Sequence, residues 1–140
     1  MFGDTWKVIN MPKRNILSNV DEYCRREGEV GYSTNGYKVI ENLLNSRTKA
    51  DKVMMFTDVQ MWNSTGGDQT IQRVWAKYKQ FMPNAKLYLF DLAGHGTVPL
   101  QVHNNGVYLI AGWSDKVFDV LHALENGQTA IGYINQIELK

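Results

Sequence analysis

This chain has a single cysteine, almost no net charge and no long apolar run. Cys24 is the single cysteine among 140 residues, so neither an intrachain disulfide nor a multi-cysteine zinc site can form. The net charge is +1, which argues against a dominant nucleic-acid surface because binding phosphates requires clustered Lys and Arg. No apolar run approaches the roughly 20 residues of a membrane-spanning helix, and the opening residues lack the features of a signal peptide. We therefore expect a soluble, cytoplasmic protein that contacts no membrane.

Sequence signatures of several common enzyme classes are absent as well. The chain has no G-x-S-x-G nucleophile turn. It has neither a GxxxxGK[ST] phosphate loop nor a GxGxxG dinucleotide loop. His95 and His103 stand eight residues apart in a predicted loop, which is not a zinc-ligand spacing. Motif spacing alone therefore indicates no enzyme.

Apolar runs of two periodicities alternate along the chain and indicate its fold class. The sequence predicts strands over residues 6–9, 52–58, 86–91 and 107–111, and helices over residues 16–24, 37–44, 71–81 and 117–124. Strands that alternate with helices predict βαβ units, hence an α/β fold with a doubly wound, mostly parallel sheet and helices on both faces. With 140 residues and 44% hydrophobic content, residues 1–140 suit a single globular domain.

One short apolar run and two connecting regions complete the predicted secondary structure. Residues 53–56 form an apolar run that is short and bounded by charge, which predicts a strand buried on both faces of a parallel sheet. Residues 92–106 contain several turn residues of the Gly and Pro type and are predicted to form a long loop. Residues 129–140 are ambiguous, and a short helix is favoured there.

Carboxylates and a threonine are expected at one edge of this sheet. Sites in parallel sheets form at the carboxyl ends of the strands, so Asp58 and Asp91 are expected there, together with the residues after Ala111. Asp58 is either a turn or capping residue or a ligand of Mg²⁺ or Mn²⁺, because these cations take oxygen ligands. Thr34 opens the preceding helix, where it is either an N-cap or a companion ligand.

Three longer stretches carry a resemblance to a known family. STNGYKVIENLL, DKVMMFTDVQMW and KLYLFDLAGHGTVPLQVHNNGVYLIAGWSDKVFDVL follow one another between about residues 31 and 124. Together they resemble the von Willebrand factor A-like module, in the form found at the carboxyl end of Ro ribonucleoprotein (TROVE) proteins and their bacterial relatives. The resemblance implies a Rossmann-like, doubly wound fold that carries a metal-ion-dependent adhesion site (MIDAS).

The resemblance also implies which residues would form that site. In the family, three loops build it: a DxSxS motif after the first strand, a threonine in the second loop and an aspartate in the third. Thr34 in STNG matches the second element and Asp58 in FTD matches the third. Thr34 would then ligate the metal, and Asp58 would contact it through water. Further candidate contributors to the same rim are Ser33, Asp91, Trp62 and Trp113.

The chain departs from the family pattern at its amino-terminal end. No DxSxS motif occurs, and residues 2–10 resemble the second and third strands of the module. The resemblance therefore implies that the first strand and first helix of the module are missing from this chain. Binding of Mg²⁺ or Mn²⁺ is therefore expected to be weak or absent unless another chain completes the site. The family's first strand is central in the sheet. Its place would be taken by residues 6–9 moving inward or by a partner's strand, which favours a homodimer or strand exchange.

Three functions follow from these observations. The leading hypothesis is a non-enzymatic binding module that engages a protein partner, or the remainder of a TROVE-type protein, through the metal rim. RNA would be bound only indirectly, because the family binds RNA mainly through a helical-repeat region that this chain does not resemble. One alternative is a metal-dependent phosphoryl-transfer hydrolase that uses Asp58 and Asp91. The other is a metal-free assembly domain with Trp62 and Trp113 as interface anchors, although core or rim packing also explains these two residues.

Overall fold

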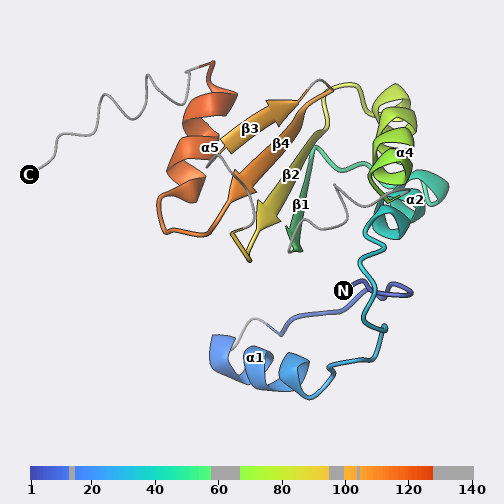
Figure 1. Ribbon diagram of the computed structural model, residues 1–140, viewed down its shortest axis with the longest axis vertical. Coiled ribbons are helices and arrows are strands. Elements are labelled where there is room, and N and C mark those ends of the chain that lie inside the picture. Colours follow the sequence, from blue (N-terminus) through green and yellow to red (C-terminus); the bar gives the residue numbers. More distant parts are fainter. Residues whose placement is uncertain (13–14, 58–66, 95–99, 104, 128–140) are drawn as a thin grey trace, which may run out of the picture.

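The computed structural model describes residues 1–12, 15–57, 67–94, 100–103 and 105–127 (Figure 1). Its elements, in chain order, are α1 (Ile16–Cys24), α2 (Tyr37–Asn45), β1 (Lys52–Thr57), α4 (Gly67–Phe81), β2 (Lys86–Asp91), β3 (Leu100–His103), β4 (Val107–Ala111) and α5 (Val117–Glu125). The four helices that the periodicity predicts are confirmed. So are the strands that correspond to β1, β2 and β4.

The sheet has the strand order β1-β2-β4-β3. β1, β2 and β4 run parallel to one another, and β3 pairs antiparallel with β4 at one edge. The register aligns Thr57 with Asp91, and Asp91 with Ala111. The three parallel strands therefore end at the same level, along an edge that we call the carboxyl edge (Thr57, Asp91 and Ala111).

Helices cover both faces of this sheet, with α2 and α4 on one face and α5 on the other (Figure 1). Successive side chains of a strand point to opposite faces, so β2 serves both layers. Leu87 and Leu89 pack in the cluster that includes α2 and α4, whereas Tyr88 and Phe90 pack in the cluster that includes α5. The α/β class and the mostly parallel sheet between helices are thus as the sequence predicts.

β1 is buried on one face only, which corrects the prediction that it is buried on both. Val53 and Met55 point into the cluster with α2 and α4, but Met54 and Phe56 remain 38% and 45% exposed. The reason is the position of β1 at the edge of the sheet. α5 packs over β2 and β4 and leaves the corresponding face of β1 open to solvent.

Residues 6–9 do not form the predicted strand. Trp6 makes only an isolated bridge with Phe2, and Lys7 forms an ion pair with Glu29 at the surface. Aromatic and β-branched residues favour a strand only where a neighbouring strand is available to pair with them, and no described strand lies beside this segment. The segment therefore does not close the edge of the sheet beside β1.

The predicted loop over residues 92–106 contains β3, a strand that the sequence analysis did not predict. Leu100 pairs with Ile110 and His103 pairs with Val107. Asn105 and Gly106 at the turn have φ angles of 68° and 69°, which is the left-handed backbone that tight hairpin turns require. Gly106 lies in a turn, as predicted, but residues 100–103 form a strand instead of continuing the loop.

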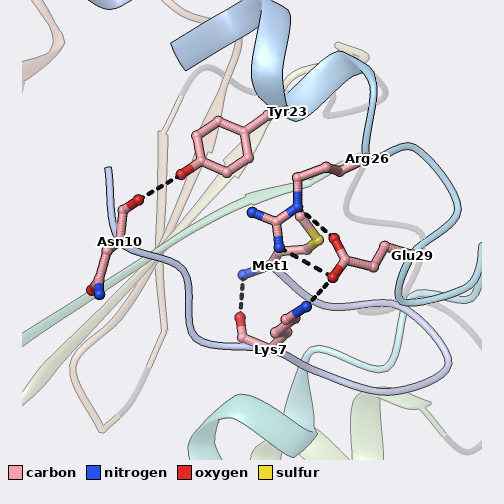
Figure 2. A network of polar contacts seen from close by, with 6 residues as sticks. All are labelled: Met1, Lys7, Asn10, Tyr23, Arg26 and Glu29. Atoms are coloured by element: carbon pink, nitrogen blue, oxygen red, sulfur yellow. Dashed lines mark hydrogen bonds and ion pairs between the residues drawn. The ribbon is translucent and has the colours of Figure 1, made fainter. Parts of the chain in front are cut away.

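The amino-terminal segment, meaning the described residues of 1–31, is held together by polar contacts (Figure 2). Arg26 Nε donates to Glu29 Oε2 at 2.5 Å, and Lys7 forms an ion pair with the same carboxylate. Tyr23 Oη donates to the carbonyl oxygen of Asn10 at 3.0 Å. α1 in this segment begins at the side chain of Asn15, which accepts from two backbone N–H groups, and it buries none of its residues.

Candidate functional site

The carboxyl edge of the sheet is the place where the fold gathers polar and aromatic side chains. Parallel strands in one register bring Thr57, Asp91 and Ala111 side by side. Ligands of open α/β sheets bind at this edge. The carboxyl edge is therefore our candidate functional site.

Asp91 is buried at this edge, with 4% of its surface exposed. Its Oδ1 atom accepts hydrogen bonds from the backbone N–H groups of Ala93 at 3.1 Å and Gly94 at 3.0 Å. This arrangement is that of an aspartate whose side chain stabilises the turn after a strand. The structure thus shows Asp91 in a turn-forming role at the site, next to its register partner Thr57.

Ser33 and Thr34 lie in the loop that leads into α2. The hydroxyl of Ser33 donates to Oδ1 of Asp4, which connects this loop to the amino-terminal segment. The carbonyl oxygen of Thr34 accepts from the N–H of Gly36 at 2.9 Å. Gly36 is the N-cap of α2, without a side-chain capping hydrogen bond, so the N-cap role predicted for Thr34 is wrong.

The metal site predicted from the sequence combines Thr34 with Asp58. Asp58 and Trp62 lie outside the described residues, so the pairing of Thr34 with Asp58 stays a prediction. Within the part of the chain that the structure describes, no group of three or more His, Cys, Asp or Glu side chains is arranged to hold a metal ion.

A cluster of four aromatic side chains dominates the carboxyl edge on the α5 face. Phe56 of β1 stacks on Phe90 of β2, with ring centroids 4.7 Å apart. Trp113 follows β4 and contacts both rings. Its ring centroid lies 5.4 Å from that of Phe56 and 5.6 Å from that of Phe90. Phe118 of α5 packs edge-on against Trp113 at 5.6 Å. We call Phe56, Phe90, Trp113 and Phe118 the aromatic cluster.

This cluster is anchored in the core and yet open to solvent. Phe90 is fully buried, whereas Phe56, Trp113 and Phe118 are 45%, 52% and 49% exposed. Trp113 is the one member that the sequence analysis identifies as a rim residue. Alternation along the strand places Phe56 on the same face as Met54. The sequence analysis missed Phe56 because it predicted that both faces of this strand are buried.

At the amino ends of the strands, opposite the carboxyl edge, Glu125 connects the end of α5 to the first residues of β1 and β2. Its carboxylate lies 2.7 Å from Lys52 Nζ and 4.0 Å from Lys86 Nζ, and it accepts from Tyr88 Oη at 2.5 Å. Lys52, and after it Tyr88, lower the pKa of the Glu125 carboxyl. Burial, together with the bond to Glu125, raises the pKa of the Tyr88 phenol. This group is a structural contact, remote from the carboxyl edge.

Comparison with known proteins gives no identification. No protein-family model matches this chain, and searches of curated proteins and of solved structures found no match. Among the described helices, none combines the length and the apolar content that a membrane crossing requires.

Proposed function

We propose that this chain is a non-enzymatic, cytoplasmic binding module of the von Willebrand A-like type, related to the carboxyl-terminal part of Ro-type RNA-binding proteins. The observation that carries this proposal is the aromatic cluster at the carboxyl edge. Three of its rings are about half exposed and rest on the buried Phe90. Rigid aromatic side chains on a firm base, at the edge where α/β sheets bind ligands, are typical of protein-binding surfaces.

A protein partner fits this surface better than RNA does. The cluster is apolar, and the chain as a whole carries a net charge of only +1, whereas contacts to phosphates require clustered cations. The partner that the resemblance suggests is the remainder of a TROVE-type protein. RNA would then be reached only through that partner.

Binding to such a partner is the direct test. The probe is a bacterial Ro-type protein from which its own von Willebrand A-like module has been removed, and the measurement is isothermal titration calorimetry in 5 mM MgCl₂. Trp113→Ala is expected to weaken binding at least about tenfold, as truncation of a central aromatic anchor does. Trp6→Ala is the matched control, since Trp6 lies in the amino-terminal segment. Equal affinities of the two variants would contradict the proposal.

A residual metal site at Thr34 and Asp58 is the second part of the proposal. A ligand that binds only the folded state stabilises it by RT ln(1 + [L]/Kd), so 10 mM Mg²⁺ or Mn²⁺ at a site with a Kd of about 1 mM adds about 1.4 kcal/mol. Thermal melting should show this shift in the wild type and not in Asp58→Ala. Asp51→Ala, at the amino end of β1, is the control that should retain the shift.

The same variants distinguish the competing functions. Hydrolysis of bis(p-nitrophenyl) phosphate with Mn²⁺ that is lost in Asp58→Ala would establish the phosphoryl-transfer alternative in place of a binding module. If the melting temperature does not depend on metal but partner binding depends on Trp113, the chain is a metal-free assembly domain. The metal and the partner are thus tested independently.

A further inference from the structure

The outer edge of β1 has no neighbouring strand among the described residues. On the inner side, the carbonyl oxygens of Asp51 and Thr57 accept hydrogen bonds from backbone N–H groups of the β2 segment at 2.9 Å and 2.8 Å. Alternate residues of a strand direct their backbone groups to opposite sides. The backbone groups of Lys52, Met54 and Phe56 therefore face away from β2.

This edge lacks the features that usually keep sheet edges from pairing. The register of β1 with β2 is unbroken from Lys52 to Thr57, so no bulge twists the strand away, and its sequence KVMMFT contains no proline. Met54 and Phe56 are 38% and 45% exposed, on the face that α5 leaves open. Open backbone groups and apolar side chains on a regular strand form a template for one more strand.

A second copy of β1 matches this edge in length and in its pairing groups. Residues 6–9, which the sequence also suggests for this place, are engaged elsewhere, because Trp6 bridges to Phe2 and Lys7 is bound to Glu29. Two copies of one edge can pair antiparallel about a two-fold axis perpendicular to the sheet. The α5 faces of the two copies then lie on the same side.

Backbone geometry selects one register for this pairing. Residues that face each other in an antiparallel pair must both direct their backbone groups across the junction. The register that places Met54 opposite Met54 of the second copy satisfies this for all outward-facing residues of β1, because Lys52 then meets Phe56. Each of these pairs exchanges both backbone hydrogen bonds. A shift by one residue would bring outward-facing residues opposite inward-facing ones and lose every bond.

The side chains are complementary in the same register. Met54 meets its own copy at the axis, and Phe56 lies beside Lys52 of the second copy, whose ammonium group is bound to Glu125 at 2.7 Å. The methylene stem of Lys52 can pack on the ring, and a cation near an aromatic face is attracted to it. The two lysines stand roughly 14 Å apart along the strands, beyond the screening length of about 10 Å at moderate salt.

We propose that two copies of this chain pair antiparallel along β1, with Met54 at the two-fold axis, and form one continuous sheet across the dimer. α5 packs over β2 and β4, so it does not obstruct the added strand. Trp113 and Phe118 belong to the β4–α5 side of the molecule and stay available to a further partner. The dimer depends neither on that partner nor on the metal site.

Sedimentation equilibrium of the full chain at increasing protein concentration tests this dimer. Met54→Lys places two lysines opposite each other at the axis, where like charges destabilise a strand pair, so the dissociation constant of the dimer should rise at least about fivefold. Met11→Lys is the matched control. It makes the same substitution at a 61% exposed methionine outside β1 and should leave the dissociation constant unchanged.

Mixing two charge variants tests the register itself. Met54→Glu alone should dimerise as weakly as Met54→Lys. An equimolar mixture of the two should associate more tightly than either variant alone, because residue 54 then meets an opposite charge across the axis. A wild type that stays monomeric, a dimer that Met54→Lys leaves unchanged, or a mixture no tighter than the single variants would overturn the proposal.

Amide hydrogen exchange of the wild type, measured by NMR, gives a second test that needs no substitution. Exchange at Met54 and Phe56 should slow as the protein concentration rises, because their N–H groups are bound across the dimer. Val53 and Met55 face β2 and should show no such dependence, so they report on the fold itself. Protection of Met54 and Phe56 that is independent of concentration would contradict the dimer, because the edge would then be covered within one chain.

Discussion

The sheet body and the amino-terminal segment of this protein are stabilised by different interactions. The sheet body, formed by the described residues from 37 onward, buries large side chains such as Trp75 and Leu89. The amino-terminal segment carries a helix without a buried residue. It is held by polar contacts around Glu29 and by a small apolar contact, because Val30 is buried and Phe2 packs against the core of the sheet body. Burying a large apolar side chain contributes about 1.5–3 kcal/mol, whereas an exposed ion pair contributes about 1 kcal/mol or less. Cooperative unfolding should therefore report on the sheet body.

The largest expected loss of stability comes from truncating a buried side chain in the centre of the sheet. Leu89→Ala removes a side chain with no exposed surface and should lower the free energy of unfolding by about 3 kcal/mol, because it leaves a cavity. Leu17→Ala, on the exposed side of α1, should change it by less than about 0.5 kcal/mol. Urea denaturation followed by circular dichroism measures both. Similar losses for the two variants would remove the distinction between the regions.

A smaller loss is expected from one buried hydroxyl in the sheet body. Tyr78 Oη donates to the Thr48 carbonyl and accepts from the Ala50 N–H, each at 2.9 Å, and so holds the connection between α2 and β1. Tyr78→Phe leaves these backbone groups without their partner and should cost about 1–2 kcal/mol. Tyr32→Phe, at an exposed position, is the control and should be neutral in the same urea titration.

The ion pair at the end of α5 should contribute less, and in a pH-dependent way. Its lysine is half exposed, so Glu125→Gln should cost no more than about 1 kcal/mol at pH 7. The pKa of Glu125 is lowered in the folded state, so its contribution is complete above its ordinary value near 4.5 and is lost as the pH falls below that value. The difference between variant and wild type should shrink in urea titrations between pH 6 and pH 3. A constant difference would contradict this account.

The smallest effect on global stability is expected from Glu29→Gln in the amino-terminal segment. Hydrogen bonds from Arg26 and then Lys7 lower the pKa of Glu29 to about 2, so the wild-type contacts persist down to the pH range between about 4.5 and 2. The variant should leave the urea midpoint unchanged but increase amide exchange around Arg26. High salt should reproduce this in the wild type, because it screens exposed charges. A shifted midpoint would mean that the two regions unfold together.

Periodicity predicted the sheet body well because burial there follows local patterns. The run KLYLFD is apolar at nearly every position, and β2 is in fact buried on both faces. The run KVMMFT looks much the same, yet it forms an edge strand with one open face. The number of neighbours that a strand has is a property of the whole sheet, and it cannot be read from six residues.

The side chains at the carboxyl edge, too, could be predicted only in part from the sequence. The turn role of Asp91 follows from the usual behaviour of aspartate after a strand, and the structure shows it. The aromatic cluster, by contrast, joins residues of β1, β2, the β4–α5 loop and α5. Only the parallel register brings Phe56 beside Phe90. Pairings between distant segments of this kind are tertiary, and residue spacing alone does not contain them.

The β3–β4 hairpin has a consequence for how the chain folds. Its strands pair across a short turn at Asn105 and Gly106, whereas β1–β2 and β2–β4 join segments that are far apart in the sequence. Local pairings form without the entropic cost of closing long loops and therefore form fastest. The indole of Trp75 then donates to the Asn105 carbonyl at 3.0 Å. We expect the hairpin to fold early, and Trp75 to align α4 with it before β1 and β2 complete the sheet.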